Sequence, residues 1–203
     1  MSLTVLTGVR ATRLSIVGLC HSVQGTSQRL AGYLDIPYEQ LSWRLAGINH
    51  QAWFLELNRD GKDLYPLLKE RAKESQIYEQ DPVRFEMMRH LGYIQTESRG
   101  HASEYSAYFR KRPDLIQKYD RDGYRGESEF YANNWPDWRA AGDQKIQRYL
   151  SGADTYQLER SEEYASIIVE AVETYQPAVI YGNVLNTRLI DNLPEDGVVE
   201  VAF

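Results

Sequence analysis

The chain has 203 residues, 42% of them hydrophobic and 26% charged, which suits one globular domain with a substantial core. Its net charge of −6 argues against nucleic-acid binding, because phosphate backbones are bound by clustered basic side chains. No apolar run approaches the roughly 20 residues that cross a bilayer, and the first residues lack a signal-peptide pattern. With a single cysteine and therefore no internal disulfide, we expect a cytoplasmic protein with no membrane partner.

Hydrophobic patterns with the periods of strands and helices alternate along the chain and predict an α+β fold. Residues 1–12 lack periodicity, and we expect them to be a segment unrelated to a domain at 13–203. A small mixed or antiparallel sheet with packed helices is expected from strands near residues 14–20, 43–48, 52–57, 178–184 and 198–202. Helices are expected at 24–34, 64–74, 83–91, 113–119, 127–149 with an interruption near Pro136, and 162–174.

The only cysteine and one of the four histidines each follow a strand-like segment. Cys20 ends the first predicted strand, next to His21 and just before a helix, and His50 follows the strand near 43–48. Neighbouring strand ends can bring two side chains to one pocket, where a thiolate and an imidazole would form half of a transition-metal site with positions left for substrate oxygens. A lone cysteine is also common as a small buried apolar residue, so these two residues alone leave both interpretations open.

The residues around Cys20 and His50 carry a more specific signal. Several segments, in chain order, resemble those of glycoside hydrolase family 4, most closely its melibiase (α-galactosidase) branch. These segments are Val17–Thr26, Ala46–Leu57, Tyr93–Ser98 running on to His101 and Glu104-Tyr105, Ser161–Ser166, Val179–Val184, Ile190–Pro194 and Val199–Val201. The resemblance extends from about Val17 to the end of the chain.

The resemblance implies an NAD- and divalent-metal-dependent glycosidase, an exception to the two-carboxylate mechanisms. In that family a bound NAD+ oxidises the C3 hydroxyl of the sugar and so acidifies the proton on C2. A tyrosine removes this proton, the glycosidic oxygen leaves by elimination, water adds, and the hydride returns. The metal, usually manganese, binds the C2 and C3 oxygens and stabilises the negative charge that develops there.

The resemblance also implies roles for individual residues. Cys20 and His50 would be the metal ligands. Tyr105 would be the base at C2, in preference to Tyr108, because the Glu104-Tyr105 pair matches the motif better. His21 stands where phospho-sugar members carry an aspartate proposed as general acid, so it would act as an acid or bind a hydroxyl. Substrate hydroxyls would also be bound by Asn49 and His101.

The sequence differs from the family pattern in one important respect. The 203 residues contain no G-x-G-x-x-G turn, the fingerprint of a dinucleotide-binding domain. The chain therefore resembles the central and C-terminal part of such an enzyme, truncated at both ends and without the N-terminal Rossmann domain. We expect it to be inactive alone and to bind an α-galactoside-type sugar, with either a homo-oligomer or a separate N-terminal half as its protein partner.

Other functions stay open on the sequence alone. The same family includes α-glucuronidases, α-glucosidases and 6-phospho-glycosidases, and no basic cluster for a phosphate lies near the motif residues, which favours an unphosphorylated sugar. A second alternative is a non-catalytic remnant that binds a sugar or a metal, or that pairs with a partner chain.

Overall fold

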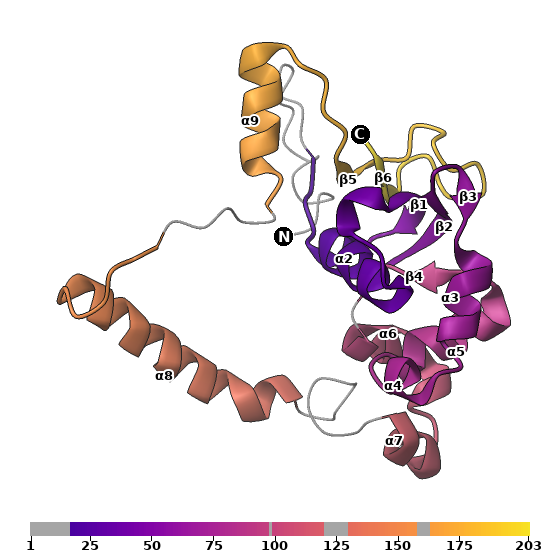
Figure 1. Cartoon of the computed structure of the whole chain (residues 1–203), viewed down its shortest axis with the longest axis horizontal. Coiled ribbons are helices and arrows are strands. Elements are labelled where there is room, and N and C mark those ends of the chain that lie inside the picture. Colours follow the sequence, from indigo (N-terminus) through magenta and orange to yellow (C-terminus); the bar gives the residue numbers. More distant parts are fainter. Residues whose placement is uncertain (1–16, 98, 120–129, 158–162) are drawn as a thin grey trace.

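The computed structural model of the protein describes residues 17–97, 99–119, 130–157 and 163–203 and shows an α+β fold (Figure 1). The segment 1–12 and the start of the strand expected at 14–20 lie outside these ranges. The described strands are β1 Ser42–Ile48, β2 Gln51–Arg59, β3 Lys62–Asp63, β4 Ile94–Gln95, β5 Tyr181–Leu185 and β6 Val198–Ala202. The described helices are α2 Ser22–Leu34, α3 Tyr65–Arg71, α4 Ser75–Tyr78, α5 Pro82–Leu91, α6 Arg99–Tyr105, α7 Pro113–Tyr119, α8 Phe130–Leu150 and α9 Ala165–Thr174, with 3-10 turns η1 Tyr38–Gln40 and η2 Ala107–Phe109.

The six strands form one sheet in the order β3-β2-β1-β6-β5, and β4 pairs with β2 beside this path. Every strand pairing is antiparallel. β1 and β2 run from the pair Ser42 and Asn58 to the pair Ile48 and Gln51, so that only Asn49 and His50 connect them. The sheet is therefore built mainly from a tight hairpin, with the C-terminal strands added alongside β1.

Four of the five expected strands are confirmed, and the fifth is wrong over its described residues. Residues 17–20 form a single bridge, from Gly18 to Asn183 of β5, rather than a strand. The chain turns away soon afterwards, because α2 begins at Ser22. The sequence did not indicate β3 or β4, since strands of two residues are too short to show an alternating pattern.

The predicted helices are confirmed in position, but α8 differs in its interior, and η1, α4, α6 and η2 were not expected. α8 is one helix of 21 residues with Pro136 inside it, whereas an interruption was expected there. Proline removes one backbone donor, and the rest of a long helix can tolerate that loss. The polar stretch 96–109, where no element was expected, contains α6 and η2. None of the described helices is both long and apolar enough to cross a membrane.

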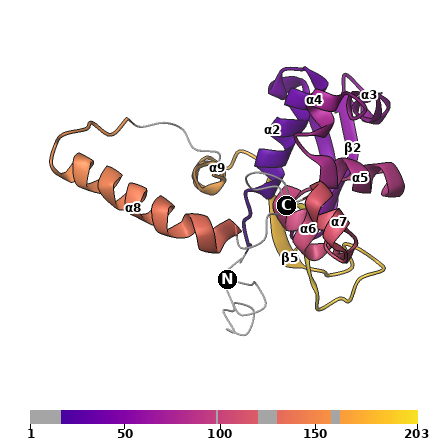
Figure 2. The same ribbon diagram turned by 90° about the horizontal axis from the view of Figure 1, so that it is seen from below.

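The main core joins the sheet to α2, α3 and α5. Its members include Leu30 of α2, Phe54 and Leu57 of β2, Leu68 of α3 and Met88 of α5, all nearly or completely buried. These helices lie against the sheet, whereas α8 extends away from it in both views (Figures 1 and 2). The packing fixes α2 relative to the β1–β2 hairpin, and both elements contribute to the site described next.

Two glycines allow close backbone approaches beside that site. Gly47 of β1 has φ +151°, and a Cβ there would lie 2.6 Å from Ala52 Cα. In β5, a Cβ on Gly182 would lie 2.3 Å from Val17 Cγ2. A side chain at Gly47 would meet backbone, so glycine shapes the hairpin tip, whereas a side chain at Gly182 would require the Val17 side chain to move.

Candidate metal centre

Cys20 is held by the segment that lies against β5. Gly18 and Asn183 exchange two backbone hydrogen bonds, of 3.0 and 2.7 Å, and the Asn183 side-chain amide donates a third to the Gly18 carbonyl at 3.1 Å. Two residues later Cys20 precedes α2, and its thiol donates to Ser22 Oγ at 3.2 Å. The sulfur is therefore anchored by β5 on one side and by the start of a helix on the other.

His50 lies at the tip of the β1–β2 hairpin. Its backbone has φ +66°, in the left-handed region that residues other than glycine seldom adopt. Its carbonyl accepts a hydrogen bond of 3.1 Å from the side chain of Gln95, which is buried in β4. Backbone strain of this kind persists only where the surrounding structure enforces it, and here Gln95 and the short connection do so.

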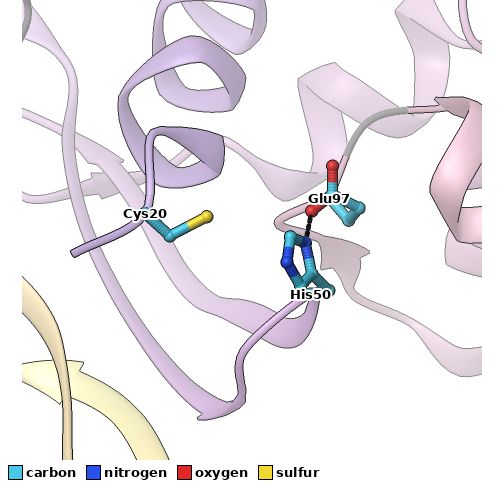
Figure 3. A group of neighbouring side chains, drawn as sticks. All are labelled: Cys20, His50 and Glu97. Carbon is cyan, nitrogen blue, oxygen red and sulfur yellow. Dashed lines mark hydrogen bonds and ion pairs between the residues drawn. The ribbon is translucent and has the colours of Figure 1, made fainter. Parts of the chain in front are cut away.

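The structure brings Cys20 and His50 together and adds Glu97, the second residue after β4 (Figure 3). One ligand atom from each of the three lies within 4.8 Å of the others, and His50 Nδ1 contacts the Glu97 carboxylate directly. Donors bind ions such as zinc at about 2.0 to 2.3 Å, so atoms this close can share one ion after small side-chain shifts. A thiolate, an imidazole and a carboxylate suit a divalent transition metal.

The surroundings of His50 favour its neutral form. Burial lowers the pKa of His50, and the neighbouring His101 lowers it further. A histidine must be neutral to bind a metal, because protonation of the ring removes the lone pair that the metal requires. The residues present therefore fit a metal centre in chemical type, spacing and protonation.

Tyr105 lies directly against this cluster. Its ring stacks on His50, with the centroids 5.8 Å apart and the planes at 26°, and half of its surface is exposed. The His101 ring lies 6.0 Å from His50, and its Nδ1 pairs with Glu104. Tyr108 is 78% exposed, with Lys111 Nζ 5.6 Å from its ring centroid. Of the two candidate bases, Tyr105 is the one that stacks on the proposed metal ligand.

Comparison with known proteins shows the family of the chain. The sequence model of the family 4 glycosyl hydrolase C-terminal domain matches residues 45–203. The chain belongs to glycosyl hydrolase family 4. An alpha-galactosidase from Bacillus subtilis (strain 168) is 43% identical over 206 aligned residues, which cover 98% of this chain and 46% of that protein. The family predicted from the sequence motifs is confirmed, and the chain spans about half the length of the curated relatives it matches.

Solved structures share the fold of this chain. The crystal structure of a putative glucosidase, lplD, from Bacillus subtilis superposes with a TM-score of 0.79 at 21% identity, covering 98% of this chain and 49% of that one. A 6-phospho-alpha-glucosidase from gut microorganisms, crystallised in complex with NAD and Mn2+, gives a TM-score of 0.67 at 18% identity, with 92% and 44% covered. The α+β class of this family 4 domain is thus confirmed.

Two residues predicted to contact substrate, His21 and Asn49, pair with carboxylates of the chain itself. His21 forms an ion pair of 3.0 Å with Glu163, and both side chains are exposed. Asn49 donates its side-chain amide to Glu200 Oε1 at 3.2 Å. Glu200 is completely buried in β6, and burial raises its pKa to about 7 although the hydrogen bond from Asn49 lowers it. The roles of His21 and Asn49 toward a sugar stay predictions.

Sequence analysis missed two carboxylates beside the hairpin, Glu97 and Glu200. Glu97 lies within the matched segment Tyr93–Ser98, which was the one signal that pointed to this part of the chain. Glu200 is the one charged residue in the otherwise apolar run Val198–Phe203, and the fold buries it completely. A buried acid in a strand commonly has a specific partner, which here is Asn49.

Proposed function

We propose that this chain provides the metal and sugar site of an α-galactosidase that cleaves glycosidic bonds by NAD- and metal-dependent redox elimination. The observation that carries the proposal is the convergence of Cys20, His50 and Glu97, with Tyr105 stacked on His50. The α-galactoside is favoured by the 43% identity to an alpha-galactosidase along nearly the whole chain.

Cys20 and His50 would hold a divalent cation, for which Mn2+ is our choice. A cation bound there supplies Lewis-acid stabilisation of negative charge on the sugar oxygens. Because the 203 residues contain no dinucleotide fingerprint, we assign NAD+ binding to sequence outside them. The role of the chain itself is to bind and orient the sugar and to move its proton.

Tyr105 is our candidate for the base that takes the proton from C2. Its ring lies beside His50, where a metal-bound sugar would present that carbon, and its half-exposed position leaves it open to a substrate. His101 lies 6.2 Å from the Tyr105 ring and could bind a hydroxyl of the same sugar. His21 is exposed one residue from Cys20, which suits a second hydroxyl contact or proton donation.

We further propose a cytoplasmic location and self-association. A thiolate ligand must stay reduced to bind its metal, which favours a reducing compartment for Cys20. Apolar side chains on and after α9 are largely exposed, with Val169 at 61%, Val172 at 65% and Val179 at 73%. Such surfaces are commonly covered by another protein surface, and a second copy of the chain is our candidate.

Calorimetric titration of the purified chain with Mn2+ tests the metal site. Wild type should bind one ion. Loss of a residue that only supports a metal ligand typically weakens binding by about 10- to 100-fold. Cys20→Ser and His50→Ala remove ligands themselves, so each should weaken binding by more than that. His90→Ala is the matched control, since His90 is an exposed histidine of α5 outside the cluster, and it should bind like wild type. Equal binding by all four proteins would refute the site.

The sugar is tested with the same protein after loading with Mn2+. Methyl α-galactoside should bind more tightly than methyl α-glucoside, because the two differ only in the orientation of one hydroxyl and a site built to bind that hydroxyl discriminates between them. Equal binding, or a preference for the glucoside, would contradict the assignment to α-galactosides.

A further inference from the structure

The contact between His50 and Glu97 joins parts of the chain that lie far apart in the sequence. His50 lies in the β1–β2 connection and Glu97 follows β4, 47 residues later. The Glu97 side chain is only 6% exposed, whereas that of His50 is 38% exposed. The carboxylate is thus more buried than the imidazole, and Figure 3 shows the two side chains facing each other.

The chemistry of this contact decides which ring nitrogen carries a proton. His50 Nδ1 faces the carboxylate, and a carboxylate has only acceptor oxygens. In a neutral ring Nδ1 must therefore carry the hydrogen, which leaves the lone pair on Nε2. Figure 3 shows this second nitrogen on the side of the ring toward Cys20, whose Sγ points into the same space. The tautomer set by Glu97 is the one that directs a metal-binding lone pair toward the thiol.

β4 and the residues after it form several hydrogen bonds with the β1–β2 hairpin, and these bonds fix the position of Glu97. Gln95 donates to the His50 carbonyl at 3.1 Å, and the Thr96 N–H donates to the Ala52 carbonyl at 2.8 Å. On its other side the Thr96 carbonyl accepts from Thr26 of α2, the helix that follows Cys20. Glu97 is therefore placed by hydrogen bonds from its neighbours to the hairpin that contains His50 and to the helix that follows Cys20.

We propose that Glu97 is a positioning residue for the metal centre, which holds His50 by Nδ1–H so that Nε2 is free to bind the cation shared with Cys20. The inference rests on the proposed function and adds to it a carboxylate that orients the metal-binding histidine. The carboxylate contacts one ring nitrogen and leaves the other for the ion, which is the arrangement in which a carboxylate commonly orients a metal-binding histidine.

Nitrogen-15 NMR of the metal-free chain tests the tautomer without any metal. Spectra that correlate ring nitrogens with ring protons should show His50 protonated at Nδ1 in wild type, at a pH of about 8 where free histidine is neutral. Glu97→Gln keeps an acceptor oxygen and should keep this tautomer, whereas Glu97→Ala should shift His50 toward protonation at Nε2. Protonation of His50 at Nε2 in wild type would overturn the proposal.

Mn2+ titration of the same variants gives a second measure. Glu97→Ala should weaken binding by about 10- to 100-fold, and Glu97→Gln should restore most of the affinity. Glu104→Ala is the matched control, because it removes the carboxylate partner of the neighbouring His101, and it should bind like wild type. Equal loss in the Gln and Ala variants would mean that Glu97 binds the ion itself, and no loss in either would remove its role.

The two measurements separate the inference from the proposed function. If wild type bound no Mn2+ at all, the proposed function would fail, while the His50 spectra would still decide whether Glu97 sets the tautomer. Unfolding curves of each variant check that Glu97→Ala remains folded, since Glu97 is a buried residue.

Discussion

Two polar clusters meet at β4 and the residues that follow it, and they are built in opposite ways. On one side Arg84 and Asp81 of the α5 start form an ion pair that is completely buried. Arg84 also donates to Thr26 of α2 and to the Gln95 carbonyl, at 2.8 and 3.2 Å. On the other side Cys20, His50 and Glu97 come together from separate segments, and the first two are partly exposed.

The difference indicates that one cluster stabilises the fold and the other binds a ligand. The buried cluster is closed, because the charged groups of Arg84 and Asp81 are directed at each other and at backbone groups of neighbouring elements. The other cluster is more open, because Cys20 and His50 are partly exposed where they lie beside Glu97 (Figure 3). We infer that the closed cluster holds β4 and α2 in place and that the open cluster uses this rigidity to bind a ligand.

The largest expected effect comes from breaking the closed cluster. Arg84→Met leaves the Asp81 carboxylate buried without its cation and should lower the free energy of unfolding by about 3 to 5 kcal/mol. Urea denaturation followed by circular dichroism measures the loss. Arg112→Met, which breaks the exposed pair with Asp114, is the control and should change stability far less, because solvent screens exposed charges. A loss below about 1 kcal/mol for Arg84→Met would show that the closed cluster is not structural.

A second expected effect comes from Glu200, the buried acid beneath the open cluster. Its carboxyl ionises near pH 4.5 when unfolded and at about 7 when folded, so between these values the folded state keeps a proton that the unfolded state has lost. Rising pH should therefore lower the free energy of unfolding across that window, by about 3 kcal/mol in all. Glu200→Gln should remove this slope and be more stable than wild type at pH 8.

Unfolding measured from pH 4 to pH 8 checks this prediction, with Glu56→Gln as control. Glu56 is a partly exposed acid of β2 that pairs with Arg44, and its replacement should leave the slope unchanged. Parallel curves for wild type and Glu200→Gln would show that Glu200 is ionised in both states.

Much of the fold could be predicted from the sequence, and the errors have physical causes. The bounds of α7 and β6 agree with prediction because each segment carries a clear local signal. Proline opens α7, and valine, which favours strands, occupies three of the five positions of β6. Residues 17–20 were predicted as a strand from their apolar character alone, but only one bridge forms, because α2 begins two residues later.

The candidate site could likewise be predicted only in part from the sequence. Cys20, His50 and Tyr105 could be named from motifs, and the structure brings all three together. Glu97 could not be assigned a role, because its contact with His50 spans 47 residues and depends on β4, a two-residue strand without a pattern of its own. Local periodicity predicts elements, whereas contacts such as this one depend on how the elements pack.

The smallest expected effect comes from removing a donor of the open cluster. Cys20→Ser replaces a half-buried thiol by a hydroxyl of similar shape, so in the presence of EDTA it should change the free energy of unfolding by less than about 0.5 kcal/mol. With Mn2+ at about 100 times its Kd, wild type should gain about 2.7 kcal/mol, because the ion binds only the folded state, and the variant should gain far less. Thermal unfolding with and without Mn2+ measures both values. A large loss in EDTA would mean that Cys20 stabilises the fold directly, and the contrast with the closed cluster at Arg84 would then disappear.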